Sequence, residues 1–167
     1  MFEGRDFSRG ENSEYNVMYH FYLNFNNFKT RQYITANCVI QDEISRRNGK
    51  VVIISFGLRE GALKWLQETQ CPFDMLLDPR RQIYHAFGLK RSVYKVWSVA
   101  AMVYYAEQMM EGKPLPKPYE NIHDDTQQMG GDFILDKEGR VKFLYPSKTS
   151  RDRPDISVIL DVLKKIQ

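Results

Sequence analysis

The sequence predicts an α/β fold with a mixed central sheet, flanking helices, and a C-terminal β-hairpin followed by a helix. Three observations support this fold class. Residues 50–56 form an unbroken, mostly β-branched apolar run, which suits a strand covered on both faces. Two strand–helix units follow one another from this run onward, joined by short loops, which favours parallel strands and right-handed crossovers. Residues 132–145 then have the pattern of strand, turn and strand.

An arm, a strand and a helix are expected in the N-terminal part. Residues 1–14 mix Gly, Ser, Asn and charged residues without periodicity, which is typical of a flexible arm. Residues 15–167 are expected to form one domain. Within it, residues 16–23 are aromatic and β-rich, which favours a strand. Residues 28–47 carry apolar side chains at helical spacing, and an Asn-Gly pair ends the predicted helix.

The next helix is expected at residues 59–69, after Gly57 ends the apolar strand. Its helical spacing predicts that Leu63 and Leu66 face the core, with Trp65 nearby. This helix completes the first of the two strand–helix units.

A turn, a strand and a short helix are expected in the twenty residues that follow. A Cys-Pro pair at 71–72 ends the preceding helix, because a residue before proline avoids the helical region. Residues 73–77 are a short apolar run, long enough for one buried strand. Asp78 is then expected to be the N-cap of a helix with Pro79 at its first position, and Gly88 ends that helix.

Residues 92–111 are predicted to form one long helix with few polar positions. The polar residues that it does contain keep it short of a transmembrane span. It is either a core or inter-subunit helix, or a Met- and Tyr-rich surface for a protein partner, for self-association or for a membrane surface. A loop at 112–131 follows, and after the hairpin a last amphipathic helix starts at Pro154.

Composition limits the classes of function. The 167 residues are 43% apolar and 27% charged, as in globular proteins that hold their core without metal or disulfides. The net charge of +3, with scattered basic residues, gives no indication of nucleic acid binding. Two cysteines make no disulfide framework, and without a signal-peptide pattern we expect a cytoplasmic protein. No cofactor motif is present, and His123-Asp124-Asp125 lacks the second cluster that a metal site needs.

Two motifs lie on either side of the predicted long helix. They are Cys71-Pro72-Phe73 with Asp78-Pro79-Arg80-Arg81-Gln82-Ile83-Tyr84 and Gly88-Leu89, and Gln127-Gln128-Met129-Gly130-Gly131-Asp132-Phe133-Ile134-Leu135-Asp136. Together they resemble the AhpC/TSA-like antioxidant enzymes, a peroxiredoxin-like family, over residues 50–145. The resemblance implies a thioredoxin-like fold, which agrees with the predicted order of parallel strands, hairpin and closing helix. It also implies thiol-dependent antioxidant chemistry.

The resemblance further implies a Cys-x-x-Cys at the N-terminus of the first helix. There the helix end stabilises a thiolate and the second thiol resolves the oxidised one. The matching position holds Phe25-Asn26-Asn27-Phe28, and no cysteine precedes Cys38. Phenylalanine is neither a nucleophile nor a resolving thiol, so dithiol chemistry is excluded at that place. Residues 1–49 are compatible with the native start of the domain or with an alternative start that lacks the active-site segment.

Cys38 and Cys71 are the remaining candidate thiols. Thr35-Ala36-Asn37-Cys38 has the Thr-x-x-Cys spacing of true peroxiredoxins, but Arg31 stands where their proline lies. The helical pattern also places Cys38 on an apolar stripe, where cysteine acts as a small hydrophobic side chain. Cys71, in a loop before a proline, is either a lone reactive thiol or a packed side chain.

Two hypotheses for the function follow from these residues. The first is a degenerate or regulatory member of the family, which binds a partner and carries out no redox chemistry. The second is a thiol-dependent oxidoreductase that reduces peroxides or disulfides with one of the two candidate thiols.

Overall fold

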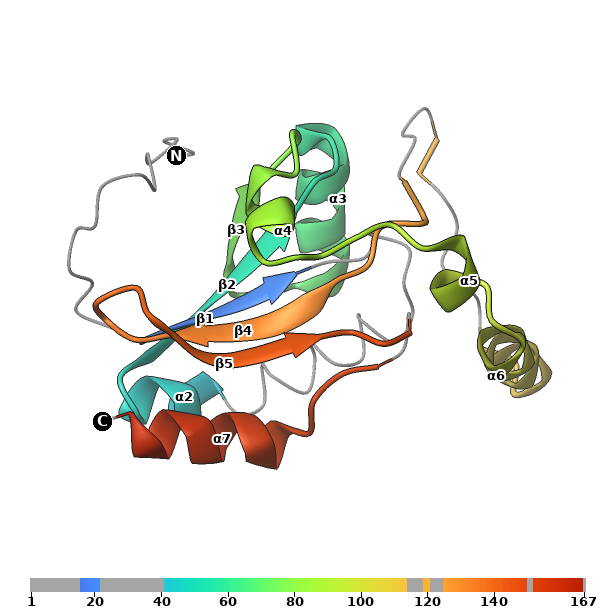
Figure 1. Ribbon diagram of the computed structural model, residues 1–167. Helices are drawn as coiled ribbons and strands as arrows, with labels where there is room; N and C mark the ends of the chain where they lie inside the picture. Colours follow the sequence, from blue (N-terminus) through green and yellow to red (C-terminus); the bar gives the residue numbers. More distant parts are fainter. Residues whose placement is uncertain (1–15, 22–40, 114–118, 121–124, 150–151, 167) are drawn as a thin grey trace.

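The computed structural model of the chain describes residues 16–21, 41–113, 119–120, 125–149 and 152–166, with only the backbone described for 16–21. In chain order its elements are β1 (Asn16–Phe21), α2 (Gln41–Arg46), β2 (Gly49–Ser55), α3 (Arg59–Thr69), β3 (Asp74–Leu77), α4 (Gln82–Ala86), α5 (Val93–Val96), α6 (Val99–Met110), β4 (Gly131–Leu135), β5 (Val141–Pro146) and α7 (Ile156–Lys165) (Figure 1). The arm expected at 1–14 and the candidate thiol Cys38 lie outside the described residues. Of the helix expected at 28–47, the structure describes the part that forms α2.

The described strands form one mixed sheet in the order β3-β2-β1-β4-β5. β1, β2 and β3 run parallel, whereas β4 runs antiparallel to both β1 and β5. The apolar run at residues 50–56 supplies β2, which lies inside the sheet between β1 and β3. The expected mixed sheet, hairpin and closing helix are therefore confirmed.

Helices cover both faces of the sheet, and β2 contributes to both cores by alternation. Its residues Val51 and Ile53 belong to a buried cluster with side chains from α2, α3 and α7, among them Trp65. The next residue along the strand, Ile54, belongs to a second cluster with Tyr84 of α4. Since successive strand residues point to opposite faces, α2, α3 and α7 lie on one side of the sheet and α4 on the other (Figure 1).

α3 confirms the helix expected at residues 59–69, but its inner face differs by one position from the expected one. Trp65 is completely buried and Ala62 nearly so, whereas Leu63 is 41% exposed. The expectation that Leu63 faces the core is therefore wrong. The inner face of α3 carries Ala62, Trp65 and the half-buried Leu66, which recur at helical spacing. Leu63 directly follows Ala62 and therefore lies about 100° further around the helix, outside that face.

α4 begins at Gln82, so the helix start expected at Asp78 and Pro79 is wrong in position. A turn intervenes, and Arg81, the residue before the helix, has left-handed backbone angles with φ 55°. Asp78 still bonds to the helix start, but from four residues ahead of it.

The single helix expected at residues 92–111 is two helices, α5 and α6. Ser98 has an extended backbone, and its hydroxyl accepts a hydrogen bond from the backbone N–H of Ala101, which makes it the N-cap of α6. The apolar residues on both sides of Ser98 obscured this start signal in the sequence. Gly112, with φ 71°, follows the end of α6. Within the described residues no helix is long and apolar enough to cross a membrane.

Candidate functional site

Cys71, the one candidate thiol that the structure describes, lies between α3 and β3. Gln70, in a left-handed conformation with φ 51°, ends α3 and turns the chain into the Cys-Pro pair. The Cys71 side chain is half-buried and packs against the buried cluster that contains Trp65 and Met75. This is the environment of a small apolar side chain that contributes to the core.

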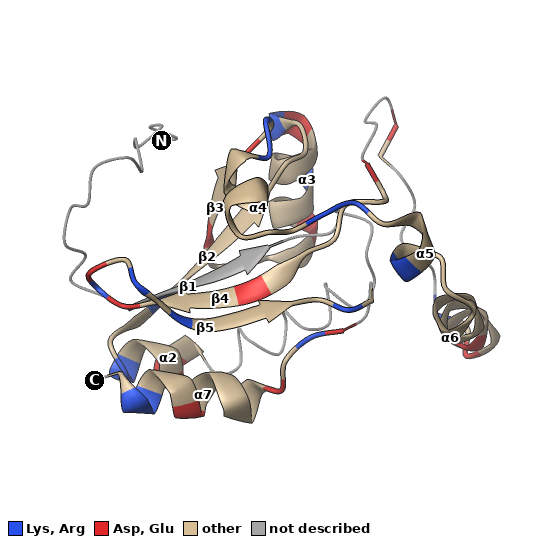
Figure 2. Ribbon diagram, in the orientation of Figure 1, with Lys and Arg blue, Asp and Glu red and all other residues tan. Residues whose placement is uncertain are grey.

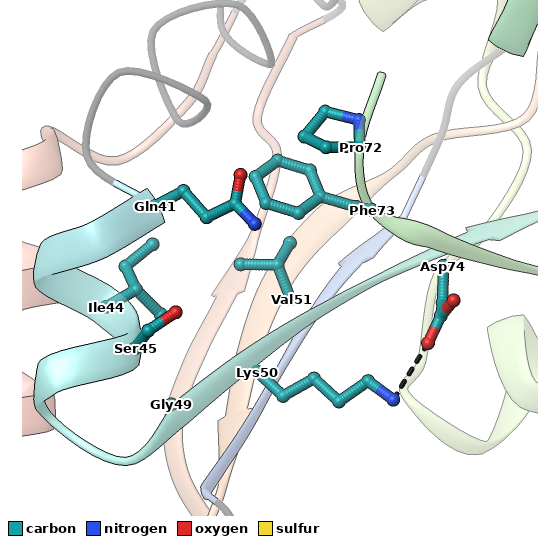
Figure 3. Close-up of a pocket in the computed structure, with 9 residues that line it drawn as sticks. All are labelled: Gln41, Ile44, Ser45, Gly49, Lys50, Val51, Pro72, Phe73 and Asp74. Atoms are coloured by element: carbon teal, nitrogen blue, oxygen red, sulfur yellow. Dashed lines mark ion pairs between the residues drawn. The ribbon is translucent and has the colours of Figure 1, made fainter. Parts of the chain in front are cut away.

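A cavity of about 150 Å³ opens beside this loop, between α2 and the first residues of β2 and β3. Figure 3 shows the side chains of Gln41, Ile44 and Val51 directed toward the ring of Phe73, with the ion pair of Lys50 and Asp74 to one side. Its lining comprises Gln41, Ile44, Ser45, Gly49, Lys50, Val51, Pro72, Phe73 and Asp74. These residues offer apolar contacts, an amide, a hydroxyl and the ion pair of Lys50 and Asp74, and they include no thiol.

Cys71 lies at the amino ends of the parallel strands. Asp74, the first residue of β3, pairs with Val52 of β2, and Cys71 precedes it. The segment that contains Phe25-Asn26-Asn27-Phe28 follows Phe21, which is at the opposite, carboxyl end of β1. In open α/β sheets ligands usually bind at the carboxyl ends of the strands, so Cys71 lies at the edge away from the usual site.

At the carboxyl ends of β2 and β3, the Asp-Pro motif forms a scaffold. The Asp78 carboxylate accepts hydrogen bonds from the backbone N–H groups of Gln82, Ile83 and Tyr84, at 2.9, 2.7 and 3.2 Å. Tyr84 is fully buried, and its hydroxyl donates to the carbonyl oxygen of Ile54 at 2.9 Å. These bonds attach the start of α4 to the end of the central strands. The Asp78 carboxylate and the Tyr84 hydroxyl are thus engaged with the backbone.

Two arginines meet on one carboxylate beside this scaffold. Arg81 approaches Asp125 to 3.0 Å, and Arg91 approaches the same oxygen to 2.7 Å. The Arg81 guanidinium also lies over the ring of Phe56, 4.6 Å from its centroid. In the sequence, the pairs Arg80-Arg81 and Lys90-Arg91 indicate either an anion site or a charged helix face, and Asp125 belongs to the weak metal candidate His123-Asp124-Asp125. The structure brings Arg81 and Arg91 together on Asp125, whose single negative charge offsets one of the two positive charges.

The Gln-Gln-Met-Gly-Gly run fixes the start of β4. Gln128 is buried, and its amide nitrogen donates to the carbonyl oxygens of Leu89 and Met129. At Gly131 an added Cβ would lie 2.7 Å from the carbonyl oxygen of Tyr145, so only glycine fits there. Both family-like motifs therefore build the scaffold around the carboxyl ends of the strands.

A buried ion pair on the hairpin was missed by sequence reasoning. Asp132 of β4 is completely buried, and the side chain of Arg153, which is 3% exposed, lies 3.7 Å from it. No local pattern around Arg153 distinguishes it from a surface arginine, so no signal in the sequence could have found the pair. Among the described residues, no group of three or more His, Cys, Asp or Glu side chains is arranged to hold a metal ion.

The comparisons with known proteins agree on one family. The model of the AhpC/TSA antioxidant enzyme family matches residues 39–149. No curated protein sequence matches the chain. The fold resembles that of peroxidoxin BcpB from Mycobacterium tuberculosis (TM-score 0.65, 17% identity, covering 93% of this chain and 82% of that one). It also resembles Mycobacterium tuberculosis AhpC (TM-score 0.61, 18% identity, 93% and 71%) and Xanthomonas campestris peroxiredoxin Q (TM-score 0.62, 12% identity, 92% and 80%). These likenesses confirm the thioredoxin-like α/β fold.

Proposed function

Because this chain belongs to the AhpC/TSA antioxidant enzyme family, we propose that it is a degenerate member, without the usual dithiol site, that acts as a regulatory or binding module. One observation carries the proposal. The position that normally holds Cys-x-x-Cys holds Phe25-Asn26-Asn27-Phe28, and the described thiol, Cys71, packs against the core at the other end of the parallel strands. Phenylalanine offers no sulfur with which a peroxide or a disulfide reacts.

The contact surface in this proposal is the α5–α6 segment, Val93–Met110. Apolar side chains are exposed along the α5–α6 segment, and this segment stands away from the sheet (Figure 1). A binding module needs such a surface, whereas a small-molecule enzyme does not. We therefore assign the α5–α6 segment to contact with a protein partner or to self-association.

A cytoplasmic location is part of the proposal. Its support is that two cysteines, Cys38 and Cys71, do not make the disulfide framework of a small secreted protein. Microscopy of a fluorescent fusion tests it, and signal confined to a membrane-bound compartment contradicts it.

The alternative function is a thiol-dependent oxidoreductase that uses Cys38 or Cys71. Its support is that Cys71 is partly exposed and directly precedes Pro72 and Phe73, which line the cavity. In that reaction a thiolate attacks one peroxide oxygen, the O–O bond breaks, and the cysteine becomes a sulfenic acid while water or an alcohol leaves. An external thiol then forms a mixed disulfide with loss of water, and a second one restores the thiol.

Peroxidase assays separate the two functions. Wild type, Cys38→Ser, Cys71→Ser and the double variant are compared with dithiothreitol as reductant and hydrogen peroxide or an alkyl hydroperoxide as oxidant. If the protein is a degenerate family member, the wild type should reduce peroxide no faster than the double variant does. Turnover that a single substitution abolishes would overturn it and identify the nucleophile. Thiol labelling of the folded protein at neutral pH gives a second readout, and we expect slow labelling at Cys71 because that side chain packs against the core.

A further inference from the structure

Two guanidinium groups share one carboxylate beside the start of α4. Arg81 Nη2 and Arg91 Nε lie 3.0 and 2.7 Å from the same oxygen of Asp125. The side chains of Arg81 and Asp125 are only 27% and 16% exposed, so water screens this group of charges incompletely. Two positive charges thus face one negative charge, and one further negative charge would complete the balance.

Arg81 has hydrogen-bond donors that no acceptor uses. A guanidinium carries five N–H donors, and buried polar groups are normally hydrogen-bonded. The Nε of Arg81 is buried and makes no hydrogen bond. Within the described part of the chain Nη1 has no acceptor either, because this side chain contacts Asp125 through Nη2 and lies over the ring of Phe56. The chain itself therefore satisfies the Arg81 guanidinium only in part.

The fold fixes the position of the Arg81 guanidinium. Its Cζ lies 4.6 Å from the centroid of the Phe56 ring, and Phe56 is itself buried. The Arg81 backbone has φ 55°, a left-handed conformation that few residues other than glycine adopt, and such outliers cluster at binding and active sites. Because the guanidinium is held in place beforehand, an anion that binds to it loses little free energy in ordering the side chain.

Arg91 presents a second, more exposed guanidinium. Its Nε contacts Asp125 at 2.7 Å and its Nη2 donates to the side-chain oxygen of Gln127 at 3.1 Å, while Nη1 has no acceptor among the described residues. A backbone bridge between Arg91 and Gln128 holds this part of the chain. The Arg91 side chain is 57% exposed, so a ligand reaches it from solvent. Figure 2 shows the basic stretch between α4 and α5 to which Arg91 belongs.

The two arginines lie at the carboxyl edge of the parallel strands. Phe56 directly follows β2, and Arg81 lies between β3 and α4. Asp125 lies before β4, which runs antiparallel to β1 and therefore begins at the same edge. In open α/β sheets ligands usually bind at this edge, which is the one away from Cys71. Position as well as charge thus favours a ligand at these arginines.

A carboxylate matches this pair of arginines better than a phosphate does. It is planar, it carries the single negative charge that completes the balance, and it accepts two parallel hydrogen bonds from a guanidinium edge. A phosphate dianion brings a second negative charge next to Asp125, and like charges at short range repel each other. Asp125 itself shows that one carboxylate can lie close to both arginines.

We infer that Arg81 and Arg91 bind the carboxylate group of a small ligand, beside Asp125 at the carboxyl edge of the sheet. The ligand accepts hydrogen bonds from the two Nη1 groups. Asp125 competes with it for both guanidinium groups, which keeps the affinity for a simple carboxylate modest. This inference goes beyond the proposed function, which assigns a protein contact to the α5–α6 segment, and it involves neither thiol.

Titration of the 15N-labelled full chain with sodium acetate at pH 7 tests the site, with sodium chloride at equal ionic strength as the control for charge screening. We expect saturable shifts of the Gln127 and Gln128 backbone amide signals and a millimolar dissociation constant. Arg81→Gln and Arg91→Gln should each weaken acetate binding by about tenfold or more, because each removes one guanidinium edge. Arg80→Gln makes the same change of charge at the exposed neighbouring residue and should weaken it by no more than about twofold.

Wild-type protein that responds to acetate no more than to chloride would overturn the inference, as would equal effects of Arg80→Gln and Arg81→Gln. Asp125→Asn removes the competing charge and keeps the shape, so acetate should bind about tenfold more tightly; weaker binding to this variant, with its other amide signals unchanged, would contradict the competition. Phosphate that binds more tightly than acetate would overturn the carboxylate as ligand. These variants keep both cysteines, so failure of this site and failure of the proposed function are distinguishable.

Discussion

Substituting Asp78 by alanine removes the carboxylate that fixes the start of α4. Three backbone N–H groups, those of Gln82, Ile83 and Tyr84, donate to it at 2.9, 2.7 and 3.2 Å. Asp78 is 6% exposed, so water replaces the lost acceptor poorly. Hydrogen bonds to charged groups contribute about 1.5–3 kcal/mol each, whereas the loss of a helix cap costs about 0.5–2 kcal/mol. Since the three bonds share one carboxylate and do not add, we expect the free energy of unfolding to fall by about 3 kcal/mol.

Urea and thermal unfolding, followed by circular dichroism, measure this loss. For a chain of this size the melting temperature should fall by roughly 6–12 °C, and the variant should still fold, because domains have about 5–15 kcal/mol of stability. Asp74→Ala is the matched control, since Asp74 pairs with Lys50 at 2.8 Å but both side chains are at least half exposed. Such surface pairs contribute about 0–1 kcal/mol. If Asp78→Ala costs no more than Asp74→Ala, the scaffold role assigned to the Asp-Pro motif is wrong.

Two further substitutions test the hairpin. Burial acts to raise the pKa of Asp136, but hydrogen bonds from Arg140 and from Lys142 outweigh it and hold the pKa well below the ordinary 3.8. Its bonds therefore stabilise the fold above about pH 4 and are lost as the pH falls further. Asp136→Asn should be less stable than wild type at pH 7 in urea titrations and approach it toward pH 2; an equal deficit at both pH values contradicts this. Gly131→Ala should cost about 1–3 kcal/mol, because the new Cβ would lie 2.7 Å from the Tyr145 carbonyl oxygen, and a loss below about 0.5 kcal/mol would show that the strands separate easily.

The sequence predicts the strands and their order along the chain well, because local signals are strong there. The β-branched run of β2, Gly57 after it and the Cys-Pro pair before β3 each act within a few residues. Helix starts are less predictable. At α4 the Asp-Pro signal is real, but the chain inserts a turn that ends at left-handed Arg81, and the carboxylate bonds to the helix start from a distance. At α6 a single serine, Ser98, divides what the apolar pattern shows as one helix.

The candidate site was harder to predict than the fold, because its contacts join distant parts of the chain. Arg81 and Asp125 are far apart in the sequence, as are Asp132 of β4 and Arg153 before α7, and no periodicity links either pair. The packed environment of Cys71 agrees with the apolar alternative for this thiol, and its reactivity remains a prediction. Cys38 lies outside the described residues, so its role too remains a prediction.

A single-turnover measurement tests most directly the hypothesis that this chain is a degenerate family member without thiol peroxidase activity. Fully reduced protein is mixed with one equivalent of hydrogen peroxide without any external thiol, and the consumption of peroxide is followed alongside the loss of titratable thiols. We predict that wild type consumes peroxide no faster than the Cys38→Ser/Cys71→Ser double variant. Rapid consumption matched by loss of one thiol, and abolished by one of the two single substitutions, would contradict the account and make the protein a thiol peroxidase.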